Sequence, residues 1–210
     1  TKRMLHTFKK PTKKSAEEYL EELGDPFRAS LLSMYDGVPQ LGSDGKEHRL
    51  DEITKISPSQ GIWLYEFCLS NKPESTLEIG MAYGFSTLFI LAASAKNLKG
   101  QHTAVDPFQK DHWNGIGLTL ANEHAQTISA KSTFRFIEDF SIRATTDLAR
   151  ENYFSDLVFV DGNHRFDDVL VDFCLCAQIT SIGGHIIFDD MWMSSLKTVA
   201  EYIRTNRSDF

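Results

Sequence analysis

Two groups of residues in this chain could do chemistry, and the first is a glycine-containing turn after an apolar strand. Residues Thr76 to Thr87 read Thr-Leu-Glu-Ile-Gly-Met-Ala-Tyr-Gly-Phe-Ser-Thr. Gly80 and Gly84 leave the backbone free of a Cβ, and Ser86 offers a hydroxyl at the start of the next predicted helix. Such a turn is typical of nucleoside binding. Its G-x-x-x-G spacing differs from that of dinucleotide folds, and the Glu78 carboxylate suits a cationic amino group better than a pyrophosphate.

The second group consists of acidic residues at the ends of two later apolar runs. Asp161 opens the segment Asp-Gly-Asn-His, and Asp189 and Asp190 follow a run that ends at Phe188. If the two strands are neighbours, three carboxylates converge on a small volume, where like charges raise each other's pKa. A divalent cation removes this conflict, and oxygen ligands fit Mg²⁺, with Mn²⁺ or Ca²⁺ as substitutes. The alternative is that Asp189 and Asp190 cap a helix or bind backbone amides.

His164 lies three residues after Asp161, where the next helix is predicted to begin. A neutral imidazole there could take a proton from a hydroxyl near neutral pH. A histidine at a helix start can equally be a polar cap, so both interpretations stay open. The other histidines considered have no carboxylate or cysteine at metal-ligand spacing and are expected to be structural or surface residues: His48, His102, His112, His124 and His185.

Further polar residues follow two other predicted strands. Asp106 ends the second strand, where its carboxylate could bridge the two hydroxyls of a ribose; alternatively it is a turn residue ahead of Pro107. The third predicted strand is followed by three polar residues that could contact a nucleobase. Alternatively, they could form an acidic helix start near the positive end of the helix dipole. They are Glu138, Asp139 and Ser141. Trp113 could cover the base or simply pack in a loop.

The elements that must position these residues alternate between strands and helices. The predicted strands are Thr76–Ile79, His102–Val105, Thr133–Ile137, Leu157–Val160 and His185–Phe188, with Gly183 and Gly184 at the turn into the last. The predicted helices are Ser86–Ala95, Leu118–Ser129, Ile142–Asn152, Phe166–Gln178 and Leu196–Arg204. This alternation predicts an α/β fold with a parallel sheet in the order 3-2-1-4-5 and helices on both faces. Because ligands bind at the carboxyl ends of such strands, both groups should meet at one edge.

The chain is expected to form one structural domain in two parts. Residues 1–70 are predicted as a helical and loop segment that covers the site, and residues 71–210 as the ligand-binding part. Ser15–Leu23 and Ser57–Ser70 have helical patterns, with Ser-Pro at the start of the second. Tyr35–His48 is rich in Gly, Asp and Pro and is predicted to be a loop that could act as a lid.

Composition limits the classes of partner. A chain of 210 residues that is 41% hydrophobic suits one sizeable core. Its net charge of -7 argues against nucleic acid or an anionic membrane as the main partner and fits a small, uncharged or cationic substrate. No segment approaches a membrane span. Cys68, Cys174 and Cys176 are expected to be reduced core residues in a cytoplasmic protein. Homo-oligomerisation stays open.

Five motifs, in order along the chain, resemble those of class I S-adenosylmethionine-dependent methyltransferases: Glu78-Ile-Gly80, Tyr83-Gly-Phe-Ser-Thr87, Asp106, Asp161-Gly-Asn-His164 and Phe188-Asp-Asp190. Over residues 53–197 the chain is similar to metal-dependent small-molecule O-methyltransferases, in the branch that includes sugar O-methyltransferases. A more distant similarity is to catechol O-methyltransferase. The resemblance implies a Rossmann-like fold, S-adenosylmethionine as methyl donor, Mg²⁺, and methyl transfer to a hydroxyl of a small-molecule acceptor.

The resemblance also implies roles for particular residues. The implied donor-binding residues are Glu78, Gly80, Tyr83, Gly84, Ser86, Asp106, Glu138, Asp139 and Ser141. The implied metal ligands are Asp161, Asp189 and Asp190, and His164, with Asp161, is the implied catalytic residue. The motif departs from the family at Ala82, where a glycine is usual. The antiparallel hairpin that normally ends the fold is expected to be missing or truncated. A metal-independent N- or O-methyltransferase and a non-catalytic S-adenosylmethionine-binding protein remain alternatives.

Overall fold

A six-stranded parallel sheet forms the centre of the computed structural model, which describes residues 4–7, 15–128 and 132–210. The order is β1-β8-β7-β4-β5-β6. The strands are β1 (Met4–Thr7), β4 (Ser75–Ile79), β5 (Gly100–Val105), β6 (Ser132–Ile137), β7 (Ser155–Val160) and β8 (Thr180–Phe188). The five strands expected from the sequence therefore lie in the expected 3-2-1-4-5 order. β1, which the sequence pattern did not predict, extends the sheet at the edge beside β8.

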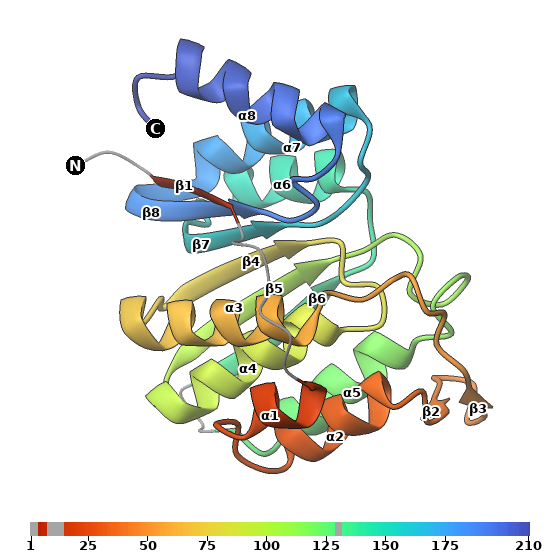
Figure 1. The fold of residues 1–210 in the computed structure, drawn as a ribbon. Coiled ribbons are helices and arrows are strands. Elements are labelled where there is room, and N and C mark those ends of the chain that lie inside the picture. Colours follow the sequence, from red (N-terminus) through yellow and green to blue (C-terminus); the bar gives the residue numbers. More distant parts are fainter. Residues whose placement is uncertain (1–3, 8–14, 129–131) are drawn as a thin grey trace.

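Helices cover both faces of the sheet (Figure 1). One face carries α3 (Pro58–Asn71), α4 (Phe85–Asn97) and α5 (Ile116–Ala125), with α1 (Ala16–Leu20) and α2 (Phe27–Tyr35) outside them. The other face carries α6 (Ser141–Arg150), α7 (Phe166–Ile179) and α8 (Ser194–Asn206). In the described residues, no helix combines the length and apolar character needed to cross a bilayer.

The central strands are buried on both faces because their side chains alternate between two cores. In β7, Leu157 and Phe159 belong to the core formed with α1–α5, whereas Val158 and Val160 belong to the core formed with α6–α8. All four side chains are buried. This explains why the strand appears in the sequence as a continuous apolar run.

Three local expectations need correction. Gly183 and Gly184 lie within β8, where the pairing with β7 is irregular, instead of forming a turn before it. The segment 35–48 contains a short hairpin, β2 (Gln40–Leu41) and β3 (Glu47–His48), so it is not wholly loop. Cys174 is exposed, whereas Cys68 and Cys176 are buried as expected. The predicted helix end at Ser129 lies outside the described residues, and α5 ends at Ala125.

The start of α3 places the N-terminal part of the chain against the site. Ser57 and Gln60 form a capping box: the Gln60 backbone N–H donates to Ser57 Oγ (3.3 Å), and the Ser57 N–H donates to Gln60 Oε1 (2.9 Å). The segment between β3 and α3 passes along the edge where the sheet strands end (Figure 1). Residues 53–56 thereby reach the cavity described next.

Candidate functional site

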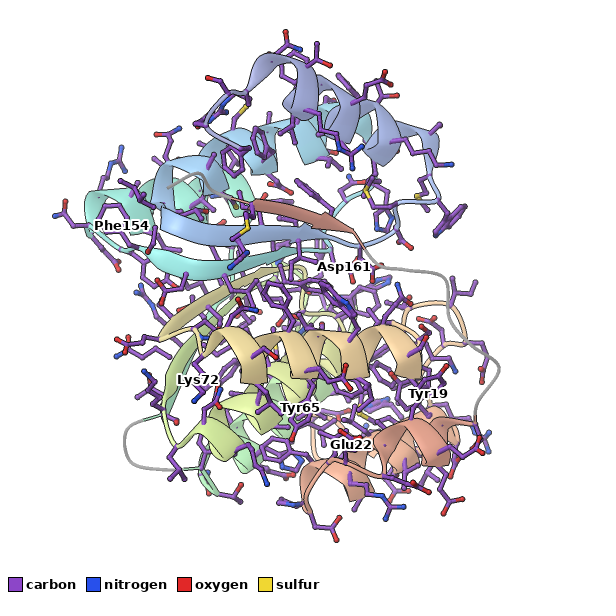
Figure 2. All side chains as sticks on the ribbon, turned by 60° about the vertical axis from the view of Figure 1, so that its left-hand side comes forward. Tyr19, Glu22, Tyr65, Lys72, Phe154 and Asp161 are labelled. Atoms are coloured by element: carbon purple, nitrogen blue, oxygen red, sulfur yellow. The ribbon has the colours of Figure 1, made fainter. Side chains whose placement is uncertain are left out.

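A cavity of about 860 Å³ lies at the carboxyl ends of the parallel strands. It is lined by the turn after β4, the segments after β5, β6, β7 and β8, and residues 53–56. Asp161 lies directly after β7, at the opposite end of that strand from Phe154 (Figure 2). Most predicted site residues line this cavity, but Glu78, Glu138 and Asp139 do not.

The turn after β4 depends on backbone conformations that favour glycine. Gly80 and Gly84 have φ angles of 88° and 84°. A Cβ on Gly80 would overlap the carbonyl oxygen of Asp161, and one on Gly84 would lie 3.0 Å from Gly117 Cα. The two glycines are therefore required by neighbouring backbone as well as by any ligand. Ala82, at the position where the motif usually has glycine, keeps the left-handed conformation with φ 45°.

Glu78 is fully buried beneath the turn and makes its contacts inside the protein. Its carboxylate accepts hydrogen bonds from the Ser86 hydroxyl and from Thr87 Oγ1 (2.5 Å), and its Oε2 lies 3.2 Å from His102 Nε2. His102 Nδ1 in turn lies 2.8 Å from Thr76 Oγ1. Glu78 and Ser86 thus tie β4, β5 and α4 together. Sequence spacing did not reveal His102 as their partner, because it lies on the neighbouring strand.

Asp106 joins the turn to β5. Its Oδ2 accepts hydrogen bonds from the backbone N–H groups of Met81 (3.1 Å) and Ala82 (2.8 Å). Its Oδ1 accepts one from the N–H of Phe108 (2.8 Å), which is the turn role considered as the alternative to ribose binding. A carboxylate has about four acceptor positions, so three of them are occupied and about one remains for a ligand hydroxyl. Asp106 also lines the cavity.

The segment after β6 presents aromatic and hydroxyl groups to the cavity. Glu138 pairs with Lys110 (2.8 Å) and Asp139 pairs with Arg143, so both acids are engaged outside it. The lining residues are Phe140, Ser141 and Ile142. Phe140 packs edge-on against Phe108, with ring centroids 5.7 Å apart. This pair was missed because aromatic residues in loops have no spacing that distinguishes binding from packing.

Tyr83 and Trp113 form another part of the lining. Their rings meet edge-on, with centroids 5.1 Å apart. Tyr83 also interacts with the side chain of Asp51, whose Oδ1 accepts hydrogen bonds from the N–H groups of Ile53 (2.8 Å) and Thr54 (2.6 Å). Tyr83 therefore holds the segment before α3 against the glycine turn.

Asp161, His164 and Asp190 form a cluster whose ligand atoms all lie within 4.8 Å of one another. His164 Nε2 lies 3.0 Å from Asp190 Oδ2 and 3.6 Å from Asp161 Oδ1. This nitrogen is buried and has no aligned hydrogen bond to any described residue. Asp190 has a φ of 49°, a strained conformation of the kind found at functional sites.

Asp189 lies beside this cluster but has different partners. Its Oδ1 accepts hydrogen bonds from Gln60 Nε2 (2.7 Å) and from the N–H of Asp190 (2.7 Å). The structure therefore brings Asp161 and Asp190 together with His164 and directs Asp189 toward α3. Gln60, which also caps α3, was not found by sequence reasoning because it lies 129 residues away from Asp189.

The electrostatics of the cluster follow from burial and close opposite charges. Burial raises the pKa of Asp161 to about 6 and that of Asp189 to about 8, and neighbouring carboxylates add to both shifts. The carboxylates of Asp161 and Asp190 raise the pKa of His164 to about 10, and His164 lowers the pKa of Asp190. In this arrangement His164 is a cation at neutral pH, which neutralises charge but cannot accept a further proton.

A protein-family model described as a methyltransferase domain matches residues 77–191, more than half of the chain. This chain belongs to that family. The matched part of the methyltransferase domain contains the glycine turn, Asp106 and the Asp161–His164–Asp190 cluster. The resemblance to methyltransferases drawn from the motifs is confirmed. Among curated protein sequences, none matches the chain significantly.

Solved methyltransferase structures have the same fold. An O-methyltransferase from Bacillus cereus in complex with S-adenosylhomocysteine (SAH) superposes with a TM-score of 0.63 at 15% identity, covering 91% of this chain and 86% of the other. The O-methyltransferase TomG from Streptomyces achromogenes, involved in tomaymycin synthesis and bound to S-adenosylmethionine (SAM), gives 0.62 at 14%, covering 88% and 79%. SAH-bound PaMTH1 from Podospora anserina gives 0.60 at 14%, covering 95% and 91%. At these identities the comparison establishes the fold.

Proposed function

We propose that the protein is a SAM-dependent methyltransferase that transfers a methyl group to a hydroxyl of a small-molecule acceptor. The observation that carries this proposal is that one cavity contains both the glycine turn and the Asp161–His164–Asp190 cluster. Similar folds with SAH or SAM bound support the choice of donor. The O-methyltransferases among them support a hydroxyl as the acceptor group.

The donor would lie against the glycine turn. We assign its amino-acid end to the backbone of Gly80–Gly84, since the Glu78 carboxylate is engaged by Ser86, Thr87 and His102. Asp106 has about one free acceptor position for a ribose hydroxyl. The base would lie near Phe108, Phe140 and Ser141, where apolar rings offer stacking area and a hydroxyl offers a hydrogen bond.

The cluster fits a divalent metal ion. Its donor set is two carboxylates and one imidazole, and the buried His164 Nε2 lacks an aligned partner. Carboxylates suit Mg²⁺ and Mn²⁺, and the imidazole nitrogen moves the preference toward Mn²⁺. We propose Asp161, His164 and Asp190 as the ligands, which gives His164 a ligand role in place of the base role. When bound, such an ion supplies Lewis acidity that lowers the pKa of a nearby hydroxyl.

The residues of the chain would contribute alignment and exclusion of water. In the transfer, the acceptor hydroxyl gives its proton to a cluster carboxylate, and the resulting oxyanion forms a C–O bond with the methyl carbon as the C–S bond of the sulfonium breaks and its electron pair passes to sulfur. Charge is neutralised in this step, so a low-dielectric cavity that holds the acceptor oxygen in line with the methyl carbon favours it. The rings of Tyr83, Phe108 and Phe140 line such a cavity, and the cluster carboxylates can accept the hydrogen bond of the acceptor hydroxyl.

A metal-independent methyltransferase is the second candidate, and one observation favours it. His164 as a cation already compensates Asp161 and Asp190 at ion-pair distances, so the cluster is stable without a metal ion.

Calorimetry should show binding of SAM and not of NAD. Methyl transfer should be lost in EDTA and restored by Mn²⁺ or Mg²⁺. Full transfer in EDTA would contradict the metal proposal, and absence of SAM binding would contradict the methyltransferase proposal itself.

A further inference from the structure

Asp172 is a buried acid that lines the cavity and has no role in the glycine turn or in the charged cluster. It lies on α7, and its Oδ2 is 3.5 Å from the position that a Cβ on Gly162 would occupy, so the carboxylate lies against the segment that follows β7. Among the described residues, its hydrogen-bond partner is the side chain of Ser141. About three of the four acceptor positions of this carboxylate are therefore open.

A carboxylate at this position is unfavourable in the ligand-free protein. Burial raises the pKa of the Asp172 carboxyl to about 6, and the charge of Asp168 adds to this shift. The group is nevertheless ionised at neutral pH. A ligand that donates hydrogen bonds to it would offset the unfavourable burial, because hydrogen bonds to a charged acceptor are about twice as strong as neutral ones.

Asp172 and Ser141 together form a surface that accepts hydrogen bonds. A serine hydroxyl has one proton and two lone pairs. Because Ser141 donates its proton to Asp172, its lone pairs remain for the cavity, which both residues line. This surface lies beside Phe140, where the base of the methyl donor is assigned.

The acids that sequence spacing places at the base are engaged elsewhere. Glu138 pairs with Lys110 and Asp139 pairs with Arg143, and neither acid lines the cavity. The segment after β6 therefore provides no carboxylate to the base. The buried acid that lines this end of the cavity is Asp172, which comes from α7.

We propose that Asp172 is a binding residue for the methyl donor that selects its base by the exocyclic amino group of adenine. This inference rests on the proposed function and specifies the base end of the site. The amino group donates to the surface formed by Asp172 and Ser141, while Phe108 and Phe140 offer apolar stacking area. A base with an oxo group at this position presents a lone pair to the carboxylate and is repelled.

The test compares SAH with its analogue in which hydrogen replaces the exocyclic amino group. Binding of both compounds to the full chain is measured by calorimetry at neutral pH. Wild type should bind SAH at least about tenfold more tightly than the analogue, because the analogue lacks the hydrogen bond to a charged acceptor. Asp172→Asn, which keeps a neutral acceptor, should lower this preference to about threefold, and Asp172→Leu, which has a similar size and no acceptor, should abolish it.

Asp167→Asn is the matched control on the same helix. Asp167 is exposed and pairs with Arg165 (3.1 Å), so this variant should keep the full preference for SAH. The analogue should bind to every variant within about twofold of its affinity for wild type. Urea unfolding checks that each variant is folded.

Three outcomes would overturn the inference and leave the proposed function standing. They are equal affinity of wild type for the two compounds, an unchanged preference in Asp172→Leu, and an equal loss of affinity for both compounds, which would show a purely structural role of Asp172. Failure of wild type to bind either compound would contradict the proposed function as well.

Discussion

Replacement of Asp172 by Asn should stabilise the protein at neutral pH. Asp172 lies on α7, is 4% exposed, and lines the cavity. Burial raises the pKa of its carboxyl from 3.8 to about 6; a hydrogen bond with Ser141 opposes this shift, and the charge of Asp168 adds to it. The folded protein therefore holds this carboxylate in surroundings that disfavour its charge.

The sign and size of the effect follow from this shift. Because the folded pKa is above the unfolded pKa, the folded state binds the proton more tightly, and the free energy of unfolding falls as the pH rises from about 4 to about 6. A shift of about 2 units corresponds to about 3 kcal/mol. Asn removes this cost and can still accept a hydrogen bond from Ser141, but its amide needs a new acceptor. We therefore expect a net gain of about 1–2 kcal/mol at about pH 7.5.

Urea unfolding of the ligand-free protein, followed by circular dichroism from about pH 4.5 to about pH 7.5, measures this gain. The difference between Asp172→Asn and wild type should grow from about pH 4.5 to about pH 6 and should then stay constant. Asp167→Asn is the control on the same helix, because Asp167 is exposed and pairs with Arg165; it should stay within about 0.5 kcal/mol of wild type at every pH. A difference that does not change with pH would refute the assignment of the raised pKa to burial.

Three further predictions concern the glycine turn. Glu78→Ala leaves His102 and two hydroxyls buried without their acceptor and should lower the free energy of unfolding by about 3 kcal/mol or more. Glu74→Ala removes an exposed ion pair and should change this free energy by less than about 1 kcal/mol. Equal effects of the two substitutions in urea unfolding would contradict the buried hydrogen-bond network around Glu78. Ala82→Gly should raise the thermal unfolding temperature, because the left-handed backbone conformation of Ala82 destabilises the folded state by about 1 kcal/mol. A lower unfolding temperature would show that the backbone at Ala82 is not strained. Asp106→Ala should weaken SAH binding by about 1.5–3 kcal/mol in calorimetry, because the ribose hydroxyl loses its charged acceptor and the N–H groups of Met81 and Ala82 lose the bond that holds the glycine turn. Unchanged affinity would argue against any donor role.

The fold was predictable because its signals are local. Continuous apolar runs such as Leu157–Val160 identify strands buried on both faces, and Ser57 followed by Pro58 marks the start of α3. The handedness of helical crossovers then leaves few possible strand orders. β1 escaped prediction because Met4–Thr7 is too short to have a pattern of its own; its pairing with β8 defines it as a strand.

The sequence by itself determined that acids, glycines and His164 gather at the carboxyl edge of a parallel sheet, because that edge is where each of them follows its strand. Only the tertiary structure decided which oxygen atoms face the cavity. Glu78 points toward His102 on the next strand, and Asp189 is engaged by Gln60 from α3, which leaves Asp161 and Asp190 to meet at His164. A carboxylate turns toward whichever donor lies nearest in space, and no local pattern encodes that donor when it comes from a distant part of the chain.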